Sequence, residues 1–228
     1  MRALVLLCGL LLVAGLFWQW GWRLPQAWDP WAALDVRQPP NLLTPYKLSR
    51  LRDDPQLCRQ ALATTSLRYR AQADSPASAN CPLQNVWRIE QGQARLSSSF
   101  LASCPLAVAY ALFEKHGLQP AAQQVFGQPV AQVDHLGSFA CRNVYNRKQG
   151  RLSQHATANA LDISGFRLQD GQRIVLARDW QAGGQKAAFL RQVQQAACKS
   201  FSTVLGPEYN AAHRNHFHLD MGLWQICR

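Results

Sequence analysis

The chain has 228 residues, of which 48% are hydrophobic and 16% charged, and this composition excludes a disordered or collagen-like protein. The formal net charge of +11 favours an anionic partner such as nucleic acid, anionic lipid or the carboxylate-rich bacterial wall, although a solvated basic surface explains it equally well. No Arg/Lys run is long enough for a nucleic-acid-binding arm, so we expect no nucleic-acid partner.

The N-terminus predicts a membrane anchor. Residues 3–17 are apolar or glycine without interruption, and three tryptophans follow before residue 23. This stretch is long enough to cross a bilayer as a helix, and the tryptophans resemble an interfacial belt. A cleaved signal peptide is the alternative, with a weak processing site at residues 13–15. We predict an uncleaved anchor over residues 1–22, which makes a single-pass inner-membrane protein with its remaining domain in the periplasm.

Proline enrichment marks the next segment. Residues 23–45 hold five prolines, which predicts a semi-extended linker. The folded domain is then expected over residues 46–228. Within it, apolar residues at helical spacing predict helices over residues 55–63, 104–115 and 187–201.

The second half of the domain carries several strand patterns. Strands are predicted from Val130 onwards and over residues 158–163, 203–205 and 216–221, while residues 143–150 form a polar loop. This mixture predicts an α+β fold, in which a small antiparallel sheet carries the functional site and helices flank it.

Six cysteines follow the predicted anchor, and none belongs to a C-x-x-C pair. They are Cys58, Cys81, Cys104, Cys141, Cys198 and Cys227. An even number in an exported domain predicts three disulfides formed in an oxidising compartment. Fifteen pairings are possible, and the sequence does not choose among them.

Four of the six histidines lie in two short segments. In the second segment, strand alternation places His216, His218 and Asp220 on one face and apolar residues on the other. In the first segment, His155 precedes Asp162 across small residues that allow close folding. Two imidazoles and one carboxylate form a three-ligand set suited to zinc, with the fourth position left for water. Either segment alone is more often a surface or structural feature, but their joint occurrence favours a metal site.

These residues resemble known motifs. Ser153-x-His155-x6-Asp162 resembles the S-x-H-x-x-G-x-A-x-D signature of the LAS-type zinc D,D-peptidases, with Ala158 where glycine is usual. That superfamily includes D-Ala-D-Ala carboxypeptidases, dipeptidases and murein endopeptidases. The ending H-x-x-H-x-H, which finishes at His218, resembles that of the penicillin-insensitive murein endopeptidases.

Across residues 44–228 the chain is most similar to the bacterial extensin-like C-terminal domain family, through D-P-x-x-C, G-S-x-x-C-R, S-x-H-A-T-A-x-A-L-D-I and H-F-H-L-D. The resemblance implies that His155, Asp162 and His218 are the zinc ligands. It also implies that Arg142 binds a substrate carboxylate or the developing oxyanion; a structural arginine beside a disulfide is the alternative.

One departure concerns the general base. Many of these peptidases carry a glutamate three residues before the last ligand, but this chain has Asn215 there, which cannot take a proton. The resemblance to the endopeptidases implies that His216 and His213 replace it, and His216 is favoured because it shares the face of His218. Asp220 is expected to orient His216 or His218, or to be simply structural.

The expected function is zinc-dependent hydrolysis of peptidoglycan peptides, by an endopeptidase or a carboxypeptidase acting on stem peptides or cross-links. The expected partners are peptidoglycan and, through the N-terminal helix, the inner membrane. A non-catalytic, zinc-containing wall-binding protein is the alternative, because the glutamate is missing. A metal-dependent nuclease fits the histidines and the positive charge, but export with three disulfides argues against it.

Overall fold

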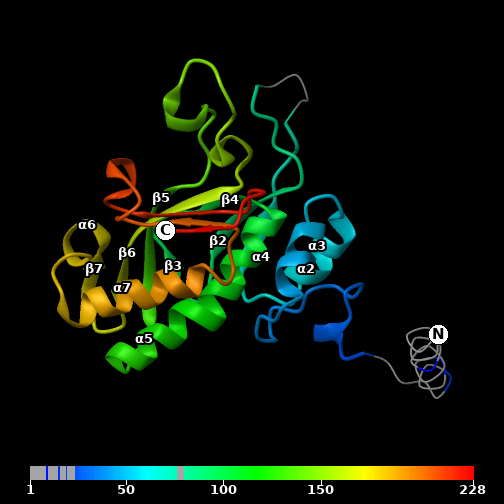
Figure 1. Cartoon of the computed structure of the whole chain (residues 1–228), viewed down its shortest axis with the longest axis horizontal. Coiled ribbons are helices and arrows are strands. Elements are labelled where there is room, and N and C mark those ends of the chain that lie inside the picture. Colours follow the sequence, from blue (N-terminus) through cyan, green and yellow to red (C-terminus); the bar gives the residue numbers. More distant parts are fainter. Residues whose placement is uncertain (1–8, 10–14, 16–18, 20–23, 76–79) are drawn as a thin grey trace.

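The structure is a computed structural model that describes residues 24–75 and 80–228, together with Gly9, Gly15 and Gln19 (Figure 1). The helices are η1 (Gln26–Trp28), α2 (Thr44–Arg50), α3 (Pro55–Leu62), α4 (Cys104–Phe113), η2 (Glu114–Leu118), α5 (Gln119–Phe126), η3 (Val144–Asn146), η4 (Gln154–Thr157), α6 (Leu176–Asp179), α7 (Gly184–Ala197) and η5 (Ala211–His213). The strands are β1 (Arg68–Ala71), β2 (Val86–Gln91), β3 (Arg95–Leu96), β4 (Phe100–Ser103), β5 (Val130–Gly137), β6 (Ala160–Leu168), β7 (Arg173–Val175), β8 (Thr203–Leu205), β9 (Phe217–Asp220) and β10 (Ile226–Cys227).

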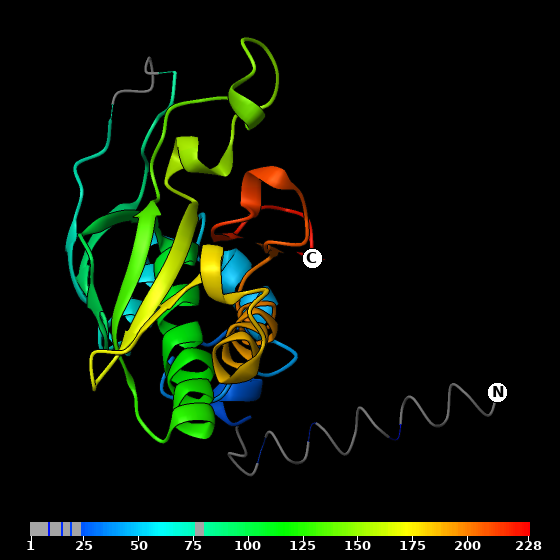
Figure 2. The ribbon, with the colours of Figure 1, turned by 90° about the vertical axis from the view of Figure 1, so that its left-hand side faces the viewer.

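The strands form two sheets. Strands β1, β2 and β4 make a three-stranded antiparallel sheet, and the larger sheet has the order β10-β8-β9-β6-β5-β3 with β7 paired to β6. Helices α4, α5 and α7 lie together on one side of the strands (Figure 2). The predicted α+β class is confirmed, but the larger sheet has seven strands and is mixed, because β3–β5 and β8–β10 are parallel pairs.

Apolar packing explains why the helices sit where they do. All ten residues of α4 are buried, so it is a central helix and not an amphipathic surface helix. Phe189 of α7 packs edge-to-face on Phe166 of β6, with ring centroids 5.5 Å apart. Such aromatic pairs add about 0.5–1.5 kcal/mol beyond their buried area. This packing fixes β6, the strand that carries Asp162, against the helical layer.

The register of the larger sheet brings distant residues together. Strands β6 and β9 are antiparallel, with Asp162 opposite His218 and Ala160 opposite Asp220. As predicted from alternation, Phe217 and Leu219 of β9 are buried in the core. The side chains at positions 218 and 220 therefore point away from the core, toward the loops at one end of the sheet.

The three predicted disulfides are confirmed, and the structure supplies their pairing: Cys58–Cys104, Cys81–Cys141 and Cys198–Cys227. The first joins α3 to α4, and the third joins the end of α7 to β10. The stretch predicted as a linker, residues 23–45, contributes Leu34 and Val36 to the core, and the Val36 carbonyl accepts a hydrogen bond from His116 Nε2 at 2.8 Å.

The prediction of a membrane-spanning helix needs correction. No helix in the part of the chain that the structure describes is long and apolar enough to cross a membrane. The longest of them, α7, has 14 residues and spans about 21 Å, short of a hydrocarbon core of about 30 Å. The predicted anchor, residues 1–22, lies almost wholly outside the described residues. The described residues therefore form an α+β fold without a membrane-spanning helix, and this finding contradicts the predicted single-pass inner-membrane location.

Candidate metal centre

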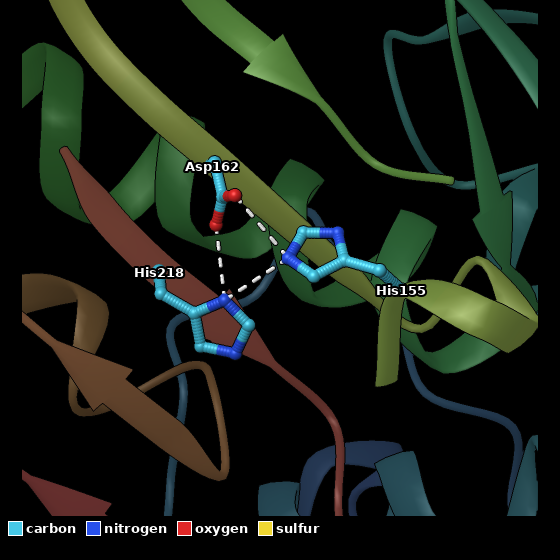
Figure 3. A group of neighbouring side chains, drawn as sticks. All are labelled: His155, Asp162 and His218. Carbon is cyan, nitrogen blue, oxygen red and sulfur yellow. Dashed lines mark hydrogen bonds and ion pairs between the residues drawn. The ribbon is translucent and has the colours of Figure 1, made fainter. Parts of the chain in front are cut away.

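His155, Asp162 and His218 converge at the end of β6 and β9 (Figure 3). His155 Nε2 lies 3.2 Å from His218 Nδ1 and 3.2 Å from Asp162 Oδ2. His218 Nδ1 lies 2.9 Å from Asp162 Oδ1. One potential ligand atom from each of the three residues therefore faces a common point.

These spacings fit a tetrahedral metal ion. Zinc held about 2.0–2.1 Å from each donor in a tetrahedron separates its donors by about 3.3 Å. The two ring nitrogens lie 3.2 Å apart, and each lies near a different oxygen of Asp162, at 3.2 Å for His155 and 2.9 Å for His218. Two imidazole nitrogens and one carboxylate oxygen also match the donor chemistry that zinc prefers. The residues present therefore fit a zinc ion with one coordination position left over.

Neighbouring acceptors orient both imidazoles toward that point. The Ser138 carbonyl lies 3.0 Å from His155 Nδ1, and a carbonyl can only accept, so Nδ1 carries the proton. Asp220 Oδ2 lies 3.0 Å from His218 Nε2 and places a proton there in the same way. In the neutral tautomers, His155 Nε2 and His218 Nδ1 are then left with lone pairs for a ligand. Asp220, predicted as an orienting partner, contacts His218 and not His216.

The charges of Asp162 and His218 are set by this close packing. Burial alone would lower the pKa of His218, but hydrogen bonds to Asp162 and Asp220 outweigh burial and raise its pKa to about 9. Burial would raise the pKa of Asp162, but hydrogen bonds to His155 and His218 hold the pKa of that carboxyl well below its usual range. Asp162 is therefore ionised, and a bound metal ion would replace the extra proton of His218.

His216 and His213 stand beside the three candidate ligands. His216 Nε2 lies 3.6 Å from Asp162 Oδ1, and the rings of His213 and His218 are 5.8 Å apart. Burial lowers the pKa of His216, and burial with the nearby His218 and His216 charges lowers the pKa of His213 to about 4. Both imidazoles are consequently neutral near pH 7, which is the form that can accept a proton.

Two asparagines fix the tautomers of these histidines. Asn215 Oδ1 lies 2.8 Å from His216 Nδ1, and Asn210 Oδ1 lies 2.8 Å from His213 Nδ1. An amide oxygen accepts only, so each Nδ1 is the protonated nitrogen and each Nε2 keeps its lone pair. Asn215, three residues before His218, thus holds the ring of His216 through its amide oxygen.

The three candidate ligands lie in a cleft of about 430 Å³. Its lining comes from the hairpin that precedes η4, the loop around η5 and the segment after β9. Arg142 lines this cleft with His216, and its positive charge contributes to lowering the pKa of that histidine. Arg142 also follows Cys141, which is disulfide-bonded to Cys81, so the same structure carries the arginine beside a disulfide.

The segment between His155 and Asp162 needs a special backbone. Ser153 Oγ accepts from the backbone N–H of His155 at 3.3 Å and caps η4. Ala158 ends η4 in the left-handed conformation, at φ 52°, and its side chain is fully buried. Glycine adopts this conformation without strain. In this chain alanine bears a conformational cost of about 1–2 kcal/mol.

Substitution of Ala158 tests this backbone. Ala158→Gly removes the strain but loses one buried methyl group, about 0.8 kcal/mol, and makes the unfolded chain more flexible. The free energy of unfolding should therefore change by less than about 1 kcal/mol. Ala158→Val adds a β-branched side chain in the same conformation and should cost more than about 2 kcal/mol. Urea denaturation measures both, and a valine variant as stable as the glycine variant would contradict this account.

The predicted site residues include most of this arrangement but miss its supports. The sequence did not identify Ser138, Asn210 and Asn215 as groups that orient the histidines. They lie in loops, where no periodic pattern predicts the direction in which a side chain points. The two asparagines could have been recognised by their spacing, because one directly precedes a candidate histidine and the other lies three residues before one. Figure 3 places the three predicted ligands together, and His216, His213 and Arg142 line the same cleft.

The chain was compared with known proteins. The model of the extensin-like protein C-terminus family matches residues 56–228, which include every residue of the candidate site. Neither the curated proteins nor the solved structures gave a match. The match extends over more than half of the chain. The chain therefore belongs to the extensin-like protein C-terminus family.

Proposed function

We propose that the protein is a zinc-dependent hydrolase of peptidoglycan peptides, an endopeptidase that cleaves stem-peptide cross-links. The observation that carries the proposal is the convergence of His155, Asp162 and His218 at zinc-compatible spacing inside a cleft. The resemblance of their segments to those of the LAS-type zinc peptidases supports both the metal and the substrate class.

In this proposal His155 Nε2, His218 Nδ1 and one oxygen of Asp162 hold the zinc ion. Zinc in such a site supplies Lewis acidity toward a water molecule and toward the amide carbonyl. Ser138 and Asp220 keep the two imidazoles in their ligating tautomers. The negative charge of Asp162 offsets part of the charge of the ion.

Proton transfer is assigned to His216. Its Nε2 lies beside the ligand set, is free of the proton and faces Asp162 Oδ1 at 3.6 Å. It accepts a proton from the attacking water and delivers it to the amine nitrogen as the C–N bond breaks. His213, with a pKa of about 4, keeps its neighbourhood uncharged and is a secondary base. Arg142 binds a substrate carboxylate or the oxyanion from the hairpin side.

The decisive measurement is the product profile on purified sacculi. The full-length, zinc-loaded protein is expected to convert cross-linked muropeptides to monomers, as identified by mass spectrometry. A chelator should stop the conversion, and added zinc should restore it. Loss of terminal D-Ala without loss of dimers would reassign the enzyme as a carboxypeptidase. An unchanged muropeptide profile would contradict hydrolysis altogether.

A non-catalytic, zinc-containing wall-binding protein is the second candidate. It is favoured by one observation, the amide of Asn215 at the place of a glutamate that could accept a proton. Such a protein would sediment with sacculi and depend on zinc for its stability, yet release no new muropeptide. The same digestion experiment separates the two candidates when the pelleted protein is quantified beside the products.

A further inference from the structure

The segment that follows β9 exposes apolar side chains in the cleft. Leu223 is 79% exposed and Trp224 is 65% exposed, and both line the cleft together with Ile226. Exposed apolar side chains that cluster at one edge of a cleft mark a binding surface more often than scattered ones do. This edge is made of side chains that a ligand could cover.

The backbone of this segment is held in place on both sides. The Trp224 carbonyl accepts from Thr203 Oγ1 at 3.1 Å, and the Ile226 N–H donates to the Ser202 carbonyl at 2.9 Å. The Gly222 N–H donates at 2.7 Å to Asp220 Oδ1, the carboxyl group that also contacts His218. The exposed side chain of Trp224 therefore extends from a backbone that hydrogen bonds hold in place. One of these bonds joins the segment to Asp220, which contacts the candidate ligand His218.

The hairpin over residues 142–153 forms a basic wall of the cleft. It contains three arginines and one lysine and no acidic residue. Its two arms pair through Val144 N to Arg151 O at 3.0 Å and Ser153 N to Arg142 O at 3.0 Å. Arg142 and Arg151 line the cleft. Both ribbon views place this hairpin and the loop around η5 beyond the same end of the sheet (Figures 1 and 2).

We propose that the cleft binds peptidoglycan with its glycan strand attached, and that Trp224 is a specificity-determining residue that stacks on a sugar ring. The flat apolar face of a pyranose ring suits an exposed indole, and the peptide carboxylates suit the basic hairpin. A free cross-linked peptide would use only the basic wall. This inference rests on the proposed function and names the form of its substrate.

The test compares two substrates that contain the same cross-link. One is a dimeric muropeptide with its disaccharides, and the other is the same dimer freed from sugar by an amidase. The wild-type, zinc-loaded protein should show a kcat/KM about tenfold higher on the glycan-bearing dimer. In Trp224→Ala this ratio should fall to about one. The control Trp31→Ala, at a tryptophan that is 72% exposed and outside the cleft lining, should keep the wild-type ratio.

The outcomes distinguish this inference from the proposed function. Equal cleavage of both dimers by the wild type, or an unchanged ratio in Trp224→Ala, overturns the glycan preference and leaves hydrolysis standing. Cleavage of neither dimer overturns the proposed function. In that case calorimetry with the same two dimers decides the inference. The inference is supported if the wild type binds the glycan-bearing dimer more tightly and Trp224→Ala abolishes this difference. Equal binding of the two dimers by the wild type overturns it.

Discussion

Replacing His155 or His218 by alanine is expected to remove zinc from the purified protein and to abolish the release of muropeptide monomers. Each substitution deletes one of the two imidazoles, whose nitrogens lie 3.2 Å apart and 2.9–3.2 Å from an oxygen of Asp162 in the intact site. Loss of an orienting partner alone typically weakens metal affinity about 10–100-fold, so loss of a direct ligand should weaken it by more than about 100-fold. Elemental analysis of the purified variants and a competition titration with a zinc indicator measure the effect.

The matched control is His116→Ala. His116 bonds the Val36 carbonyl and lies outside the cleft lining, so its loss should leave zinc content unchanged. Circular dichroism shows whether each variant is folded. The ligand assignment is wrong if folded His155→Ala and His218→Ala proteins keep one zinc per chain with wild-type affinity.

Replacing His216 by alanine should leave zinc bound and slow hydrolysis by about 100-fold or more, because general-base catalysis contributes about 10²–10⁴-fold. The unprotonated Nε2 of His216 lies 3.6 Å from Asp162 Oδ1, and Asn215 holds the ring in this position. The measurement is kcat on a cross-linked dimer, with zinc content determined on the same preparation.

His213→Ala provides the comparison for that prediction. His213 has no ion pair with Asp162, and its low pKa makes it the weaker proton acceptor, so its loss should cost less than the loss of His216. Asn215→Ala should fall between the two, since it frees the His216 ring without removing it. If His216→Ala is active and His213→Ala is inactive, His213 is the principal proton acceptor and His216 the secondary one.

Strand alternation was sufficient to predict the half of the site that lies on β9. His218 is followed by a buried leucine and preceded by a buried phenylalanine, so its direction could be read from the pattern. Asp162 on β6 follows the same rule. His155 was harder to place, because it sits on a 3-10 turn, where strand alternation gives no direction; the small residues before Asp162 and the resemblance to a known motif linked it to the other two.

Other features depend on contacts between distant parts of the chain. The three-stranded sheet was not anticipated, and one reason is that β1 is short and mostly exposed, with arginines at two of its four positions. The disulfide pairing depends on contacts between distant elements, such as α3 and α4, which the Cys58–Cys104 bond joins. The position of Trp224 at the edge of the cleft was also missed, since an exposed tryptophan in a non-periodic segment carries no directional signal.

The pairing of Asp162 with His218 across β6 and β9 has a consequence for how the protein matures. The two residues are 56 positions apart in the chain, and the ladder of the sheet brings them together. In small zinc fingers the ion nucleates folding, because its ligands sit close in sequence and no core exists without it. Here a core of helices and strands already holds both donors. In the proposed zinc protein, folding is therefore expected to precede metal loading, and the ion would enter a chain that has already reached its final form.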